Sequence, residues 1–426
     1  MSEKSLARIE KVLSVYPVEG ADNVEMCQIQ DYHILVKKSE NIQKNDLVIY
    51  VEIDSILPDG LPKSDLVLLE EATKRAKKAN GDDLKALQEE IARLTSQNTL
   101  PEFEFLRQKK FRIKAWKLSK FGIISMGIVF PLSILQTVSK VLGKEFTEEI
   151  KEGLDVTDFL GIQKVVEDLE EIDKTELETN SNKLEKILDR HLMKYSIYRK
   201  YKKEIFGERI KGSWLDIFPS QSDETPAQKC YTKFIEKNGR TGYYKTSKIE
   251  GQNYSSYLFQ TSHFFNIFKK DHFGICTHHR NLITDDGSQF WKTAKELDLE
   301  KRMKSIGKNL LIRGEHAGGK IQGNIYKLSE HHVYLFEVWD ISKKRFYTFD
   351  EFMEFCEKYE FEHVPVIDDN YTLPETVQEI LQESNRFDEL VSGVKVQGEG
   401  IVVRLKDDIT KSFKVRSPEY LLLHGK

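Results

Sequence analysis

A candidate nucleophile, Lys248, stands in the stretch "YYKTSKIEGQNYSSYLF", where an aromatic-rich strand runs into a turn and Gly251 follows three residues later. A lysine attacks an electrophile only when it is deprotonated, which requires burial, nearby positive charge or a metal ion. The spacing of lysine and glycine is not distinctive, because it recurs at Lys78, Lys140, Lys304, Lys320 and Lys395. Residues elsewhere in the chain must therefore decide between these six lysines.

Charged residues follow the predicted strands downstream of this lysine in a definite order. Arg280 comes after the strand in "HFGICTHHRN", Glu315 ends the strand in "LLIRGEHAGGKIQGN", and Glu399 opens "GEGIVVRL". Lys414 and Arg416 lie two residues apart in "KSFKVRSPEYLL", so they share one strand face. Basic groups, or a metal held by acidic groups, would lower the pKa of a lysine beside them. The order of these residues, rather than the tetrapeptide, singles out the lysine in "KIEG".

The composition indicates a globular protein of two or three domains, because 426 residues exceed one ordinary core. The net charge of -4 means that any nucleic-acid surface must be a local basic patch. Four dispersed cysteines argue against a disulfide scaffold and a structural zinc site, and they favour a reducing cytosol or nucleus. The longest apolar run, "FGIISMGIVFPLSIL", is interrupted by glycine, serine and proline, so no membrane segment is expected.

The pattern of short runs predicts an α+β protein in three parts. Residues 1–137 read as a small β-barrel with a helical hairpin inserted at about 64–100, whose two helices are expected to pack together. Basic and aromatic residues alternate from Lys110 to Lys117, which suits either a nucleic-acid face or an ordinary solvated strand. Residues 138–208 read as a charged helical linker, and its basic end either follows a phosphate backbone or is simply a solvated helix face. Residues 209–426 read as antiparallel sheets with helices packed on them.

The ordered motifs resemble the covalent nucleotidyltransferase superfamily of polynucleotide ligases and RNA capping enzymes. "KIEG" is similar to its nucleophile motif and "HHRN" to the arginine motif. "RGE", "VYLFEVWDI", "GEGIVVR" and "SFKVR" are similar to the four motifs that follow. The barrel text and the phrases "GLDVTDFLGIQK" and "FPSQSDETPAQ" resemble more narrowly the ATP-dependent, nick-sealing RNA ligases with an OB domain first. Only twelve residues follow Lys414, whereas DNA ligases and capping enzymes place their OB domain there.

This resemblance implies an N-terminal OB-fold and a C-terminal adenylyltransferase domain of ATP-grasp-like ligase type. It implies that ATP forms a lysyl-AMP bond, that AMP caps an RNA 5′-phosphate, and that a 3′-hydroxyl then seals the break. The implied catalytic residues are Lys248, Lys414 and Arg280. The implied nucleotide contacts are Glu250, Asn253, Glu315, Phe336 and Arg416. Mg²⁺ or Mn²⁺ would bind near Glu250, Glu315 and Glu399.

Two alternatives follow from the same residues. One is a GTP-dependent guanylyltransferase of the capping type, and the other is a non-catalytic RNA-binding repair scaffold. Pro226 stands where the family typically has an arginine, and Arg416 replaces a second lysine, which keeps the charge but changes its geometry. The expected partners are RNA and ATP, with no membrane, and a monomer in the cytoplasm or nucleus is expected.

Overall fold

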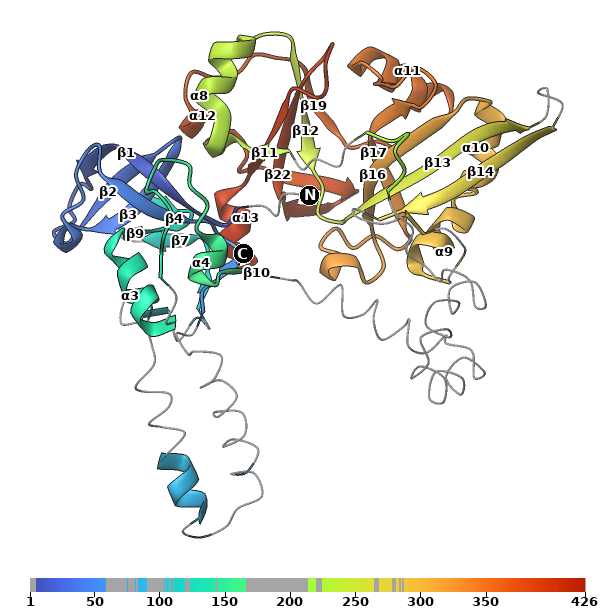
Figure 1. Cartoon of the computed structure of the whole chain (residues 1–426). Helices are drawn as coiled ribbons and strands as arrows, with labels where there is room; N and C mark the ends of the chain where they lie inside the picture. The colour runs from blue at the N-terminus through green and yellow to red at the C-terminus, as the bar shows by residue number, and fades with distance from the viewer. Residues whose placement is uncertain are drawn as a thin grey trace. The chain divides into compact units, whose positions relative to one another are not determined.

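The structure is a computed structural model that describes residues 5–58, 75, 81, 83–89, 103, 105–106, 109, 111–118, 123–142, 145–165, 214–219, 224–263, 268–277, 281–282, 285 and 287–425. Contacts within the chain divide it into two units (Figure 1). Unit 1 comprises Met1–Val166 and Leu421–Lys426, and unit 2 comprises Glu167–Tyr420. No helix among the described residues is long and apolar enough to cross a membrane.

Unit 1 is built around one long strand, β1 (Ala7–Pro17), that serves two halves of a curled sheet. Its first residues pair with β4 and its last residues pair with β2, with a register shift after Val12. A bulge of this kind bends a strand and helps a sheet to close. The sheet order is β3-β2-β1-β4-β9, in which the other strands are β2 (Val24–Ile29), β3 (Tyr32–Lys37), β4 (Leu47–Val51) and β9 (Ile128–Pro131).

Shorter strands complete unit 1, in a three-stranded sheet β10-β5-β6 and a pair β7-β8. Their bounds are β5 (Ser55–Ile56), β6 (Arg112–Ile113), β7 (Trp116–Leu118), β8 (Ile123–Ser125) and β10 (Gln163–Lys164). Helices α3 (Ser133–Leu142) and α4 (Thr157–Leu160) pack on the barrel, and Val138, Val156 and Phe159 lie in its main core. The stretch 145–165 is therefore part of unit 1.

The predicted helical insertion is described only in part. Residues 83–89 are helical, as expected, and Leu87 is buried. Apart from Arg75 and Gly81, the remainder of the insertion lies outside the described residues, as do residues 166–213 of the predicted linker. The domain limits at 137/138 and 208/209 stay predictions.

Unit 2 contains two main sheets, which are antiparallel except where β11 runs parallel to β23. The first has the order β11-β23-β22-β12-β19, with bounds Thr225–Pro226, Ser412–Arg416, Gly400–Leu405, Tyr243–Lys248 and Val366–Tyr371. The second has the order β15-β14-β13-β16-β17-β18, with bounds Asn281–Leu282, Phe268–Cys276, Gln252–His263, Leu310–Ala317, His332–Asp340 and Arg345–Phe346. A separate hairpin joins β20 (Phe387–Val391) to β21 (Val394–Gln397).

The helices of unit 2 cover these sheets in two groups (Figure 1). Helices α8 (Ala227–Asn238) and α12 (Val377–Glu383) share a core with the first sheet, around Tyr231, Ile380 and Phe413. Helices α9 (Gln289–Glu296), α10 (Leu299–Ile306) and α11 (Phe349–Lys358) share a core with the second, around Met303 and Phe355. The last helix is α13 (Pro418–Leu423). The predicted α+β class, with an OB-type barrel ahead of an antiparallel-sheet domain, is confirmed.

Candidate active site

Lys248 is the last residue of β12 and forms an ion pair with Glu399, with 2.6 Å between Nζ and Oε2. The pairing of β12 with β22 brings them together, because Lys248 lies opposite Gly400. Gly400 has φ +149°, and a Cβ there would lie 2.0 Å from the carbonyl oxygen of Val415. Only glycine fits this close approach, so Gly400 lets β22 begin beside β23 with Glu399 facing the lysine.

Gly251 explains why this particular lysine–glycine spacing matters. A Cβ on Gly251 would lie 2.5 Å from the carbonyl oxygen of His316 and 2.8 Å from Cγ of Glu315. The turn after Lys248 therefore packs directly on β16. In the next strand, Asn253 lies opposite Glu315. The two predicted carboxylates, Glu315 and Glu399, thus reach the lysine from different sheets.

The charges of these groups are coupled. Burial lowers the pKa of Lys248, but the negative charges of Glu399 and Glu315 outweigh burial and the positive charge of Arg416, so the pKa is raised. The pKa of Glu315 is raised to about 8, mainly by burial. The negative charge of Glu399 contributes to this rise, and the positive charge of Lys248 opposes it. The predicted lowering of the lysine pKa is therefore not present in this arrangement, and it requires further positive charge beside the two carboxylates.

Glu250 is buried deeper than expected for a surface metal ligand, with a relative exposure of 7%. Its backbone N–H donates to the hydroxyl of Tyr326 (3.1 Å), and its carboxylate is hydrogen-bonded to the phenol of Tyr420. Glu250 therefore connects the turn after the nucleophile to α13, within unit 2. This contact gives Glu250 a positioning role that the sequence did not reveal.

Lys414 and Arg416 both lie on β23, opposite Val402 and Gly400 of β22. Lys414 opposes the rise in the pKa of Glu315, and Arg416 opposes the rise in that of Lys248. Both positive charges therefore act on ionisable groups of this site, and their predicted roles toward a nucleotide stay predictions. Pro226 pairs with Lys414 in the parallel ladder between β11 and β23, so the position that departs from the family pattern lies directly beside this lysine.

Phe336 is half-buried in β17, and two guanidinium groups lie near its ring. The Cζ atoms of Arg404 and Arg313 are 5.6 Å and 5.9 Å from the ring centroid. Regular alternation along this strand predicts that Tyr334, Phe336 and Val338 share one face. Tyr334 does pack in the same cluster as Phe336, but Val338 packs in a different one. The prediction is wrong for Val338, because the pairing of β16 with β17 shifts register here and reverses the alternation.

A buried ion pair beside this ring was missed from the sequence. Arg404 Nη2 lies 2.5 Å from Oε1 of Glu224, and only 4% of the Arg404 side chain is exposed. Burial raises the pKa of Glu224, but Arg404 and Lys414 outweigh this effect and hold the pKa below its usual value. Glu224 belongs to the phrase "SDETPAQ", two residues before Pro226. Arg404 belongs to the fourth motif, where it follows a run of apolar residues on one strand. A charged residue in such a strand is buried only with a partner, so this pattern could have indicated a buried ion pair.

The residue before the nucleophile also has a buried partner. The Ser247 hydroxyl donates to Oδ1 of Asp388 (2.9 Å), and Arg386 Nη1 donates to both the Ser247 hydroxyl (2.7 Å) and Asp388 (3.0 Å). Burial raises the pKa of Asp388, while Arg386 opposes the rise. This group ties β12 to the β20–β21 hairpin immediately behind Lys248. No predicted motif included it.

Arg280 and the adjacent His278 and His279 lie outside the described residues, so the predicted arginine stays a prediction. Cys276, which the sequence placed near these histidines, is buried in an apolar cluster.

Across the described part of the chain, no group of three or more His, Cys, Asp and Glu side chains is placed to hold a metal ion directly. The predicted set of Glu250, Glu315 and Glu399 therefore does not form a closed cage. Glu315 and Glu399 still place two carboxyl groups against one lysine, and the raised pKa of Glu315 reflects their excess of negative charge. A hydrated divalent ion, which takes waters and phosphate oxygens as further ligands, fits such a site.

Comparisons with known proteins agree with this geometry. Residues 242–416 match a family described as RNA ligase, and residues 6–97 match an OB-fold domain. An unliganded mutant of Naegleria gruberi RNA ligase matches with a TM-score of 0.66 and 23% identity, over 100% of this chain and 99% of that chain. This chain has the fold of an RNA ligase. The predicted resemblance to RNA ligases with an OB domain first is thereby confirmed.

Two further structures of the Naegleria gruberi enzyme give the same result. A mutant with ATP and Mn matches with a TM-score of 0.67 and 22% identity, over 99% of this chain and 100% of that chain. The enzyme with pyrophosphate matches with a TM-score of 0.65 and 23% identity, over 99% of each chain. None of the curated protein sequences matches the chain. Because the sequence identity is only 22–23%, these structures establish the fold alone. The sequence support for ligase activity comes from the family match over residues 242–416.

Proposed function

We propose that this protein is an ATP-dependent RNA ligase that joins RNA 3′-hydroxyl and 5′-phosphate ends through a lysyl-AMP intermediate. The observation that carries the proposal is the position of Lys248, which contacts Glu399 at 2.6 Å and experiences the charges of Glu315 and Arg416, while Lys414 acts on Glu315. The family match over residues 242–416 supports the same activity.

In the first step, the ammonium group of Lys248 separates from Glu399 and loses a proton to solvent. The neutral Nζ then attacks the α-phosphorus of ATP. An N–P bond forms, the bond from the α-phosphorus to the bridging oxygen breaks, and pyrophosphate leaves. The nitrogen loses a second proton to give the lysyl-AMP phosphoramidate. Lys414 and Arg416 stabilise the negative charge that develops on the phosphate oxygens.

Glu315 and Glu399 would hold a hydrated Mg²⁺ or Mn²⁺ ion together with the nucleotide phosphates. Such an ion supplies positive charge that lowers the pKa of Lys248 and offsets the charge of the phosphates. Phe336, with Arg404 and Arg313 beside it, is the proposed surface for stacking of adenine. Glu250 and Asn253 are proposed to contact the nucleotide, and Arg280 the phosphates.

In the second step, an oxygen of the RNA 5′-phosphate attacks the phosphorus of lysyl-AMP, and the amine of Lys248 leaves and regains a proton. In the third step, the 3′-hydroxyl attacks the 5′-phosphate, loses its proton, and displaces AMP as the new phosphodiester forms. The OB-fold unit is proposed to bind the RNA for these later steps. The protein is proposed to act as a monomer in the cytoplasm or nucleus.

The test is covalent labelling of the purified chain with α-radiolabelled ATP or GTP and Mg²⁺ or Mn²⁺. We expect an acid-labile adduct with ATP that is lost in Lys248→Ala, because this variant lacks the amine that would form the N–P bond. The matched control is Lys245→Ala, on the same strand, whose ammonium pairs with Glu383 at 2.6 Å. This control should label like the wild type.

Labelling with GTP instead of ATP would favour the capping-type alternative. The absence of any adduct, or an adduct that survives Lys248→Ala, would contradict nucleotidyl transfer by this lysine and leave the RNA-binding scaffold as the remaining alternative.

A further inference from the structure

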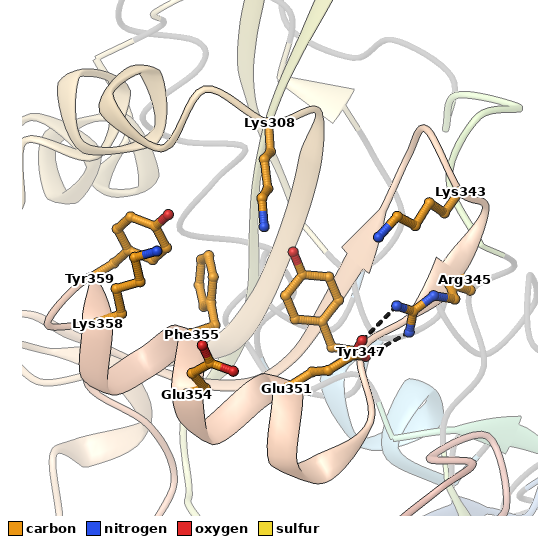
Figure 2. Close-up of a pocket in the computed structure, with 9 residues that line it drawn as sticks. All are labelled: Lys308, Lys343, Arg345, Tyr347, Glu351, Glu354, Phe355, Lys358 and Tyr359. Carbon is orange, nitrogen blue, oxygen red and sulfur yellow. Dashed lines mark hydrogen bonds and ion pairs between the residues drawn. The ribbon is translucent and has the colours of Figure 1, made fainter.

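Away from the site around Lys248, unit 2 contains a pocket with the chemistry of a phosphate site. It has a volume of about 170 Å³ and is lined by Lys308, Lys343, Arg345, Tyr347, Glu351, Glu354, Phe355, Lys358 and Tyr359 (Figure 2). Lys308 precedes β16, Lys343 and Arg345 come from the turn into β18, and α11 forms the floor. None of these residues belongs to the site around Lys248.

The pocket has more positive than negative charge. Of its two carboxylates, Glu351 is already engaged, because Arg345 donates to both of its oxygens at 2.6 Å and the backbone N–H of Thr348 donates to one of them at 3.0 Å. The pair of Arg345 and Glu351 therefore holds the start of α11 in place. Three lysines remain against Glu354 and against Asp340, which lies 3.8 Å from Lys343, so positive charges still exceed negative ones.

Hydrogen-bond donors converge in this pocket. Figure 2 shows the ammonium groups of Lys308 and Lys343 and the hydroxyl of Tyr347 pointing toward one region. The Lys343 side chain is 64% exposed, and its ammonium nitrogen lies 3.8 Å from Oδ2 of Asp340, an ion-pair distance that is too long for a hydrogen bond. Burial raises the pKa of Tyr347, although the nearby Lys308 opposes the rise, so the phenol keeps its proton and can donate. Two ammonium groups and a phenol are suitable ligands for phosphate oxygens.

The size of the pocket limits the occupant. Sites that enclose a whole small molecule typically measure about 300–1,000 Å³, so about 170 Å³ suits a single phosphate with part of its sugar. Such a group belongs most naturally to a strand that continues outside the pocket. From Leu310, next to the pocket, to Glu315 at the active site is five residues of β16, or about 17 Å at roughly 3.4 Å per residue.

We propose that this pocket binds a backbone phosphate of the RNA substrate, about five nucleotides from the join. The proposal rests on the proposed RNA ligase function. The count of nucleotides follows from about 17 Å at roughly 3.4 Å of axial rise per nucleotide. The pocket would thus extend the RNA contact beyond the adenylylation site and favour substrates with a long arm on one side of the break.

The test compares Lys308→Ala/Lys343→Ala with the wild type in binding nicked RNA duplexes whose arms are about 4 or about 12 base pairs on each side. We expect the affinity for the long duplex to fall on the order of tenfold at low salt. The magnitude of the slope of log K, where K is the RNA association constant, against log salt concentration should decrease by about one to two. The variant neutralises less phosphate charge, so its binding releases fewer counterions from the RNA. The affinity for the short duplex should not change.

Lys301→Ala/Lys304→Ala is the matched control. It removes the same charge from the exposed surface of α10, where these lysines pair with Asp298 and Glu300. Labelling of Lys248 by ATP is measured in parallel and should be normal in both double variants. If the wild type is not labelled by ATP, the proposed ligase function is wrong. RNA binding is measured without ATP, so it tests the pocket separately.

Three results would overturn the proposal. The pocket variant could bind both duplexes like the control, or it could lose the same affinity for the short and long duplexes. It could also lose the binding of inorganic phosphate, measured by calorimetry, while RNA binding is unchanged. That last result would assign the pocket to a free phosphate group instead of an RNA strand.

Discussion

Glu315 and Glu399 lie against one lysine, and this excess of negative charge sets the electrostatics of the active site. Glu399 forms the direct ion pair with Lys248 at 2.6 Å, whereas Glu315 is half-buried and the loss of solvent around it raises its pKa to about 8. Near neutral pH, Glu315 therefore holds its proton more often than an exposed carboxyl group does. A divalent cation would favour its ionised form, so the site is arranged to respond to the charge of its ligands.

The raised pKa of Glu315 predicts that stability falls as the pH rises. The folded protein binds this proton more tightly than the unfolded chain, so its stabilising effect is complete below about pH 4.3 and is lost as the pH rises through about 8. Between pH 5 and 9, we expect the free energy of unfolding to decrease by about 1–3 kcal/mol from this group. Glu315→Gln should lack this decrease, because an amide does not ionise.

Urea unfolding at several pH values measures this effect. Lys248, Glu399, Glu224 and Lys414 also act on Glu315, so the comparison is made between wild type and variant at each pH. Parallel pH profiles for the two proteins would contradict the prediction.

At the scale of elements, the site depends on where strands begin, end and bulge. The order of motifs correctly placed Lys248, Glu399 and Lys414 at or beside strands, because alternation and turn residues are local signals. The prediction that Val338 shares a face with Phe336 was wrong, because the register shift between β16 and β17 depends on a partner strand about twenty residues away. The pair of Glu224 and Arg404 was missed for the same reason, since 180 residues separate its members.

This ion pair predicts a measurable coupling between the segment before β11 and strand β22. Arg404→Met should lower the free energy of unfolding by about 3–5 kcal/mol, because it leaves the charge of Glu224 near the core without its partner. Replacing both residues with methionine should recover most of the loss, because an apolar pair of similar volume removes both charges. A double-mutant cycle by urea unfolding measures the coupling. Additive losses in the double variant would show that the pair contributes nothing beyond its separate side chains.

At the scale of the whole molecule, the chain combines an OB-fold unit with a unit that contains the proposed nucleotide site. Unit 1 presents Trp116, which is 48% exposed, and the ammonium group of Lys109 lies 4.0 Å from its ring centroid. Phe111, which the sequence pattern placed on the same basic and aromatic face, is instead buried in the core. An exposed aromatic ring beside a cation is suited to stacking with a base and to contact with a phosphate.

Trp116→Ala is therefore expected to separate RNA joining from formation of the AMP adduct. Loss of one stacking contact costs about 1–3 kcal/mol in RNA binding, or roughly 5- to 150-fold in affinity, and the sealing of nicked RNA should fall accordingly when RNA is limiting. Labelling of Lys248 with ATP should be unchanged, because every residue of that site lies in unit 2. Leu13→Ala, an exposed apolar residue of β1, is the control. If Trp116→Ala lowers adduct formation as much as sealing, the first step also depends on unit 1, and the proposed division of labour between the units is wrong.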